Sequence, residues 1–147
     1  MGPGLLKRYV VGFMFTEDRQ QVLLIRKAKT RDGLGWMLGR LNGIGGMLAE
    51  KENPFLAMSR EFEEETGLFV NPLDWQWCGR YARQDSHEVI AFRLFSDAAR
   101  KETQSSDEGS IFLHRVDEVP FLPHVDNLRW LLPLLLKHDL TTFSIEE

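Results

Sequence analysis

The segment Gly46–Leu68, GMLAEKENPFLAMSREFEEETGL, contains the start and stop signals of one short helix. Asn53 is a favoured N-cap residue, and Pro54 fits the first helical position, where an N–H has no helical partner. Gly67 fits the left-handed position that commonly follows a helix. Apolar residues recur at i, i+3 and i+7 and form the side predicted to pack on the core: Phe55, Met58 and Phe62.

Four glutamates, Glu61, Glu63, Glu64 and Glu65, lie at the C-terminal end of the predicted helix. The negative end of the helix dipole destabilises each carboxylate there by a few tenths of a kcal/mol up to about 1 kcal/mol. Glu61, Glu64 and Glu65 also share one face and repel one another, whereas Glu63 points away from it. A solvated acidic face is the ordinary alternative, but a hard divalent cation takes carboxylate oxygens and would relieve the repulsion. The sequence therefore favours a site for Mg²⁺, or for Mn²⁺, on this face.

Composition narrows the class of protein. The chain has 147 residues, 43% hydrophobic and 27% charged, which favours a single domain spanning residues 1–147. A net charge of −4 argues against long duplex nucleic acid as a partner, because such binding needs many Lys and Arg contacts to phosphate. The single cysteine, Cys78, stands in an aromatic run and is predicted to be a buried structural thiol. With no disulfide, secretory signal or apolar run of about 20 residues, we expect a cytoplasmic protein without a membrane span.

Outside the helix, short apolar segments bounded by turn residues predict strands at residues 9–15, 21–27, 41–46, 75–82, 88–96 and 111–116. The first two are predicted to form a hairpin, and a turn is predicted at residues 84–86. Residues 28–41 are predicted to form a glycine-rich loop long enough to be functional. Residues 127–138 predict a second helix, kinked or restarted at Pro133, and residues 141–147 a loose tail or short edge strand. Strands mixed with two helices predict an α/β fold, with a mixed β-sheet sandwiched between α-helices.

The opening segment also matches a named pattern: Gly, five residues, Glu, seven residues, then Arg-Glu-apolar-x-Glu-Glu-x-Gly-apolar. Its nine specified positions are filled without a gap by Gly46, Glu52, Arg60, Glu61, Phe62, Glu64, Glu65, Gly67 and Leu68. The chain therefore resembles the Nudix hydrolases, which cleave a nucleoside diphosphate linked to a further group X. The resemblance implies the Nudix fold and a pyrophosphatase activity. Residues 39–46, 107–109, 119–121 and 130–136 also resemble the MutT-type branch, especially its oxidised-purine nucleoside triphosphatases.

The resemblance assigns roles to residues of the box and one beyond it. It implies these metal ligands: Glu61, Glu64, Glu65 and the backbone carbonyl of Gly45. One of the three glutamates could instead be the general base, and coupled carboxylates do not permit a single assignment. Glu108, just before a predicted strand, matches a further acidic ligand or base, and its alternative is a solvated loop acid. Arg60 is expected to pair with a glutamate and fix the helix, and Glu52 to bond loop amides or Arg60.

Five residues outside the box are candidates for contact with a nucleotide. Lys27 ends the second predicted strand and could bind phosphate, or it could be an exposed strand-end lysine. Asn42 could read a base edge through its amide, but Asn-Gly is also a strong turn signal. By similarity to the triphosphatase branch, Asp126 and Asn127 could meet a purine edge, and they could equally cap the last helix. Trp36 could stack on a base or only close its loop.

The chain departs from its relatives at several positions. Ala49 and Lys51 stand where the box usually has Glu and Gly, which puts the geometry of this loop in question. Leu41 replaces a tryptophan of the oxidised-purine branch, and Leu128 replaces one of its base-reading aspartates. Residues 83–86 offer neither the proline nor the tyrosine of branches that act on ADP-ribose or dinucleoside polyphosphates.

Together these features predict a Mg²⁺-dependent nucleoside triphosphate pyrophosphohydrolase that yields a nucleoside monophosphate and pyrophosphate. The alternative within the family is a pyrophosphatase acting on a nucleotide sugar, a nucleotide cofactor or capped RNA. A third hypothesis, from a different class, is a non-catalytic nucleotide-binding module. We expect a nucleotide as substrate, and a monomer or homodimer as the assembly.

Overall fold

The computed structural model describes residues 7–29, 35–83 and 87–146. Within these residues the chain forms eight strands: β1 Lys7–Phe15, β2 Gln21–Lys27, β3 Leu41–Asn42, β4 Ile44–Met47, β5 Gln76–Arg83, β6 His87–Phe95, β7 Gly109–Arg115 and β8 Phe143–Glu146. Its two α-helices are α1, Pro54–Thr66, and α2, Leu128–Leu135. Four short 3₁₀ helices connect them: η1 Gly35–Met37, η2 Pro72–Asp74, η3 Asp97–Arg100 and η4 Val116–Phe121.

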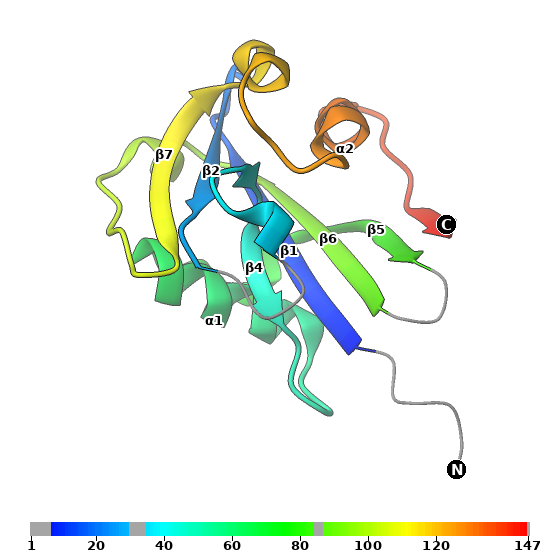
Figure 1. The fold of residues 1–147 in the computed structure, drawn as a ribbon. Helices are drawn as coiled ribbons and strands as arrows, with labels where there is room; N and C mark the ends of the chain where they lie inside the picture. The colour runs from blue at the N-terminus through cyan, green and yellow to red at the C-terminus, as the bar shows by residue number, and fades with distance from the viewer. Residues whose placement is uncertain (1–6, 30–34, 84–86, 147) are drawn as a thin grey trace.

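The strands form one mixed sheet in the order β3-β2-β1-β6-β5-β8, with β4 paired to β1 and β7 paired to β2. β1 runs parallel to β6 and antiparallel to β2 and β4, so the predicted hairpin of the first two strands is confirmed. Figure 1 shows α1 against one face of the sheet and α2 against the other. The predicted α/β fold, a mixed sheet between helices, is therefore confirmed.

Each face of the sheet has its own apolar core because side chains alternate along a strand. In β1, Met14 points into the core under α1, whereas Phe13 and Phe15 point into the core under α2. The α1 core includes these buried residues: Met58, Phe62, Trp75 and Phe92. The α2 core includes these: Leu24, Val125, Leu131 and Leu135. α1 is thus anchored by its apolar side, and its acidic side remains beside β4.

The structure corrects several predicted boundaries. The segment predicted as one strand at residues 41–46 is two strands, because β3 pairs with β2 whereas β4 pairs with β1. α2 ends at Leu135, three residues before the predicted end, where the Arg93 guanidinium donates to the carbonyls of Leu135 and Lys137. Pro133 lies inside this single short helix.

The predicted tail is an edge strand, because β8 pairs in parallel with β5. The turn predicted at residues 84–86 lies outside the described residues. No helix in the described part of the chain is long and apolar enough to cross a membrane.

Candidate active site

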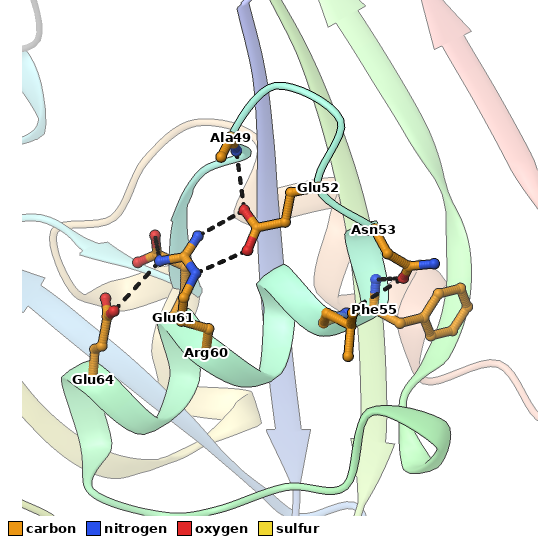
Figure 2. Close-up of polar contacts among 8 residues, drawn as sticks. Ala49, Glu52, Asn53, Phe55, Arg60, Glu61 and Glu64 are labelled. Atoms are coloured by element: carbon orange, nitrogen blue, oxygen red, sulfur yellow. Dashed lines mark hydrogen bonds and ion pairs between the residues drawn. The ribbon is translucent and has the colours of Figure 1, made fainter.

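α1 begins and ends at the residues that the sequence predicts. The Oδ1 atom of Asn53 accepts a hydrogen bond from the backbone N–H of Phe55 at 2.8 Å (Figure 2). Gly67 follows the helix with φ 79°, and its N–H donates to the carbonyl of Glu63 at 2.9 Å. These caps satisfy end groups that would otherwise lack partners, while the buried side chains of Met58 and Phe62 fix the rotation of the helix on the sheet. The glutamates therefore project from a rigid element.

Arg60 connects the helix to the loop before it. Its guanidinium makes two hydrogen bonds of 2.9 Å to the two carboxylate oxygens of Glu52 (Figure 2). Glu52 also accepts a hydrogen bond of 3.0 Å from the backbone N–H of Ala49. The hydrogen bonds from Arg60 are the main reason that the pKa of Glu52 is lowered. The structural roles predicted for Arg60 and Glu52 are present in this geometry.

The same arginine reaches the acidic face of α1. Arg60 Nη1 lies 3.0 Å from Glu61 Oε1 and 3.4 Å from Glu64 Oε1. The side chain of Glu64 is 58% exposed and that of Glu61 only 14%. A Cβ atom placed on Gly46 would lie 2.5 Å from the Glu61 carboxylate, so this side chain packs directly on the backbone of β4. A larger residue at position 46 would therefore displace the Glu61 carboxylate from this position.

Glu65 has the most unfavourable environment of the three. It is 6% exposed, and its Oε2 atom is buried without a hydrogen-bond partner among the described residues. Burial raises the pKa of Glu65 to about 7, and the charges of Glu61, Glu108 and Glu64 push it in the same direction. The positive charge of Lys27 opposes this shift. Burial likewise raises the pKa of Glu61, although Arg60 acts against it.

The residues fit a hard divalent cation in their chemistry. Among the described residues, no three acidic, imidazole or thiol groups are already gathered as a metal-binding cluster. The ion pairs of Arg60 account for part of this, because they hold Glu61 and Glu64 toward the guanidinium. A buried carboxylate oxygen without a partner, beside two further carboxylates, is the kind of donor that Mg²⁺ takes. Glu61, Glu64 and Glu65 could therefore hold such an ion after a change of side-chain conformation.

Gly45 and Glu108 are the two further predicted metal ligands, and the structure constrains them differently. A Cβ atom on Gly45 would collide with the carbonyl oxygen of Val10, so the pairing of β4 with β1 already requires glycine there. Its carbonyl as a metal ligand stays a prediction. The backbone carbonyl of Glu108 accepts from the N–H of Ala28 at 2.8 Å, and its side chain lies 3.7 Å from Lys27 Nζ. Glu108 is thus close enough to affect Glu65, although half of its side chain is exposed.

Asn127 does not cap α2. It stands at the N-cap position with helical backbone angles, and its side chain makes no capping hydrogen bond. Instead, its Nδ2 donates to the hydroxyl of Tyr81 on β5 at 2.7 Å, and its Oδ1 is buried without a partner among the described residues. The sequence analysis did not single out Tyr81. The two residues are separated by 46 positions, and no local pattern signals their contact.

The other candidates for nucleotide contact are less constrained. The side chain of Asp126 is 97% exposed and lies 4.0 Å from Arg40. Asn42 lies in β3, and its Oδ1 accepts a hydrogen bond of 2.8 Å from the N–H of the next residue, Gly43. Backbone hydrogen bonds join Leu41 to Pro123 and Val125, so β3 lies beside the segment that leads to Asp126. The side chain of Trp36 lies outside the described part of the structure, and its role stays a prediction.

Lys51, in the loop before α1, adopts a backbone conformation that is unfavourable for a residue with a side chain. Its φ of 63° lies in the left-handed region, at the position where the resemblance to the Nudix box leads one to expect glycine. The turn is thus kept at the expense of backbone strain of roughly 1 kcal/mol. Lys51→Gly is expected to stabilise the protein by about 0.5–1 kcal/mol, measured as a shift of the urea midpoint. Lys51→Ala is the control, because it removes the charge but keeps a Cβ; a gain as large as that from glycine would contradict this explanation.

Comparison with known proteins agrees with this geometry. The family model for the NUDIX domain matches residues 6–135, so the chain belongs to the NUDIX domain family. This match and the sheet topology confirm the predicted Nudix fold, and with its solved neighbours they support a pyrophosphatase of that family. The comparison with curated proteins finds no match.

The solved structures similar to this chain include the following three. A mutator MutT protein from Bacillus halodurans has 22% identity and a TM-score of 0.72, over 95% of this chain and 87% of its own. A NUDIX hydrolase from Nitrosomonas europaea has 16% identity and a TM-score of 0.76, over 99% and 80%. The NUDIX domain of NrtR from Shewanella oneidensis, solved in complex with ADP-ribose, has 16% identity and a TM-score of 0.72, over 89% and 86%. At these identities the likeness concerns the fold.

Proposed function

We propose that the protein hydrolyses a nucleoside triphosphate, including an oxidised purine form, to a nucleoside monophosphate and pyrophosphate with Mg²⁺ or Mn²⁺ as cofactor. The observation that carries the proposal is the buried Oε2 of Glu65, which has no hydrogen-bond partner among the described residues and lies beside Glu61 and Glu64. Burying such acidic groups destabilises the folded protein unless a bound positive charge compensates them. A bound divalent cation supplies Lewis-acid polarisation of phosphate oxygens and a more acidic bound water.

The chain's own groups have distinct parts in this proposal. Glu61, Glu64, Glu65, Glu108 and the carbonyl of Gly45 would hold the cation. Arg60 orients the helix and neutralises part of the acidic charge through its contacts with two of the glutamates. Because its pKa is raised to about 7, the Glu65 carboxyl can hold or release a proton near neutral pH.

We place the base at the far end of the substrate. The buried Oδ1 of Asn127 is an acceptor that a base N–H could satisfy, and its amide is already held by Tyr81. Asp126, Asn42 and Trp36 are further candidates for contact with the base. The phosphate chain would then extend toward Lys27 and α1. We also propose that residues 1–147 act as one cytoplasmic domain, as a monomer or homodimer.

The alternative is a pyrophosphatase acting on a nucleotide sugar, a nucleotide cofactor or capped RNA. The NrtR domain, solved with ADP-ribose, supports retaining it, because that ligand is a nucleoside diphosphate linked to a sugar. The chemistry at the cleaved phosphoanhydride is the same in both cases. The substrate pocket, and not the glutamates, decides between them.

A substrate panel with product analysis tests the proposal. The four ribonucleoside and four deoxyribonucleoside triphosphates, 8-oxo-dGTP and ADP-ribose are incubated with Mg²⁺, and products are separated by ion-exchange chromatography. We expect a monophosphate and pyrophosphate from at least one triphosphate, and no reaction in excess EDTA. Hydrolysis of ADP-ribose alone would favour the alternative. A folded protein that cleaves nothing in a panel extended to capped RNA would contradict both and favour a non-catalytic module.

A further inference from the structure

Lys27 places a positive charge beside Glu61, Glu64, Glu65 and Glu108, which together are called the acidic cluster. It is the last residue of β2, and its side chain is only 17% exposed. Both of its backbone polar groups are hydrogen-bonded: its N–H donates to the carbonyl of Arg40, and its carbonyl accepts from the N–H of Gly39. The backbone is thus fixed, and the flexible methylene chain is the part of this residue that can move.

The ammonium group faces acids from two different elements. Lys27 Nζ lies 3.7 Å from Glu108 Oε2, which is longer than a normal hydrogen bond and makes the pair a mainly Coulombic contact. Its charge also acts on Glu65 of α1, where it lowers a pKa that burial and three neighbouring carboxylates raise. Lys27 is therefore the counter-charge shared by the buried Glu65 and the half-exposed Glu108.

We propose that the Lys27 ammonium is a built-in counter-cation that occupies the acidic cluster in the metal-free protein and gives way when a divalent ion binds. This inference rests on the proposed metal site. A buried carboxylate needs compensating charge, and a lysine ammonium supplies it as a single mobile point charge. A divalent ion among the same carboxylates repels the ammonium. The long contact to Glu108 is weak enough to be given up, and the freed ammonium can then meet a substrate phosphate.

The proposal predicts opposite effects on metal and substrate. Without the ammonium, a divalent ion no longer competes with a resident positive charge, so it should bind more tightly. The phosphate chain of the substrate should bind less tightly, because the freed ammonium is missing. A lysine that only contacts phosphate would affect the substrate alone. A lysine that only supports the fold would not tighten metal binding.

Mn²⁺ binding to the whole protein, followed by electron paramagnetic resonance, tests this without substrate. Lys27→Met is expected to lower the dissociation constant for Mn²⁺ by on the order of tenfold, as expected for losing a nearby unit charge partly screened by solvent. Lys29→Met is the matched control: it removes the same charge two residues away, but its ammonium pairs with Asp107 at 2.9 Å and is exposed. Its Mn²⁺ affinity should change less than about twofold, since exposed charges are screened. Lys27→Arg keeps the charge and should bind Mn²⁺ as weakly as the wild type.

The outcomes separate this inference from the proposed function. Tighter Mn²⁺ binding in Lys27→Met alone, with a raised KM for the substrate, supports it. Equal affinity in wild type and Lys27→Met, or equal tightening in Lys29→Met, overturns it while leaving the metal site intact. A wild-type protein that binds no Mn²⁺ contradicts the metal site itself and the inference with it. Circular dichroism checks that each variant folds, and Lys27→Gln replaces Lys27→Met if the latter does not.

Discussion

Glu64→Gln is expected to lower kcat by roughly 10²–10³-fold, because a metal-ion contribution of several kcal/mol depends on its charged ligands. The side chain of Glu64 is 58% exposed and its ion pair with Arg60 measures 3.4 Å, so little of the fold depends on it. Exposed pairs of this kind contribute about 0–1 kcal/mol. The variant should therefore keep its unfolding midpoint while it loses activity. Steady-state hydrolysis of the best substrate from the panel, at saturating Mg²⁺, measures the effect.

Glu63→Gln is the matched control for this experiment. It makes the same change of charge on the same helix, one residue earlier, at an exposed position. Its kcat should stay within about twofold of the wild type, because a screened surface charge has little influence on the site. If Glu64→Gln is as active as Glu63→Gln, the assignment of Glu64 to the site is wrong.

Glu65→Gln is expected to have opposite effects on activity and stability. In the folded protein the pKa of Glu65 is raised to about 7, against an ordinary value of 4.5. The folded state therefore holds the proton more tightly than the unfolded state, and metal-free stability falls as pH rises through this window. The full penalty above it is roughly 3 kcal/mol. Replacing the carboxyl with a neutral amide should remove most of the penalty and abolish hydrolysis.

Urea unfolding in EDTA measures this effect. Between about pH 5 and pH 8 the wild type should lose stability more steeply than Glu65→Gln, so that the variant is the more stable at the upper end. Adding Mg²⁺ at the upper pH should stabilise the wild type and leave the variant nearly unchanged, because ligand binding stabilises only the state that binds. Parallel pH profiles for the two proteins would show that Glu65 is not buried in the way described.

The sequence predicted the acidic helix well because its signals are local. Asn53, Pro54 and Gly67 determine where α1 begins and ends within a few residues of chain, and the structure confirms all three. The pairing of Arg60 with Glu52 was also predictable from the sequence, since the two residues belong to one motif. Short apolar segments bounded by turn residues predicted most of the strands, including the first hairpin.

The rest depends on contacts between distant parts of the chain. From the sequence, Glu61, Glu64 and Glu65 were predicted as equivalent metal ligands on one helix face. In the structure, packing buries Glu65 and leaves Glu64 exposed. Glu108 approaches Glu65 only because β7 pairs with β2, and a propensity argument contains no information about that pairing. The bond from Asn127 to Tyr81 was missed for the same reason. Tertiary contacts thus determine which of the predicted site residues have shifted pKa values and which of them lie close to one another.

The central claim is that the acidic face of α1 binds a divalent cation. Calorimetric titration of the metal-free protein with Mg²⁺ near neutral pH, in buffers of different ionisation enthalpy, tests it most directly. We expect saturable binding to the wild type with release of protons, because Glu65 is partly protonated there and must ionise to act as a ligand. The release should disappear in Glu65→Gln. Absence of saturable heat in the wild type, or identical titrations of wild type and Glu65→Gln, would contradict the claim.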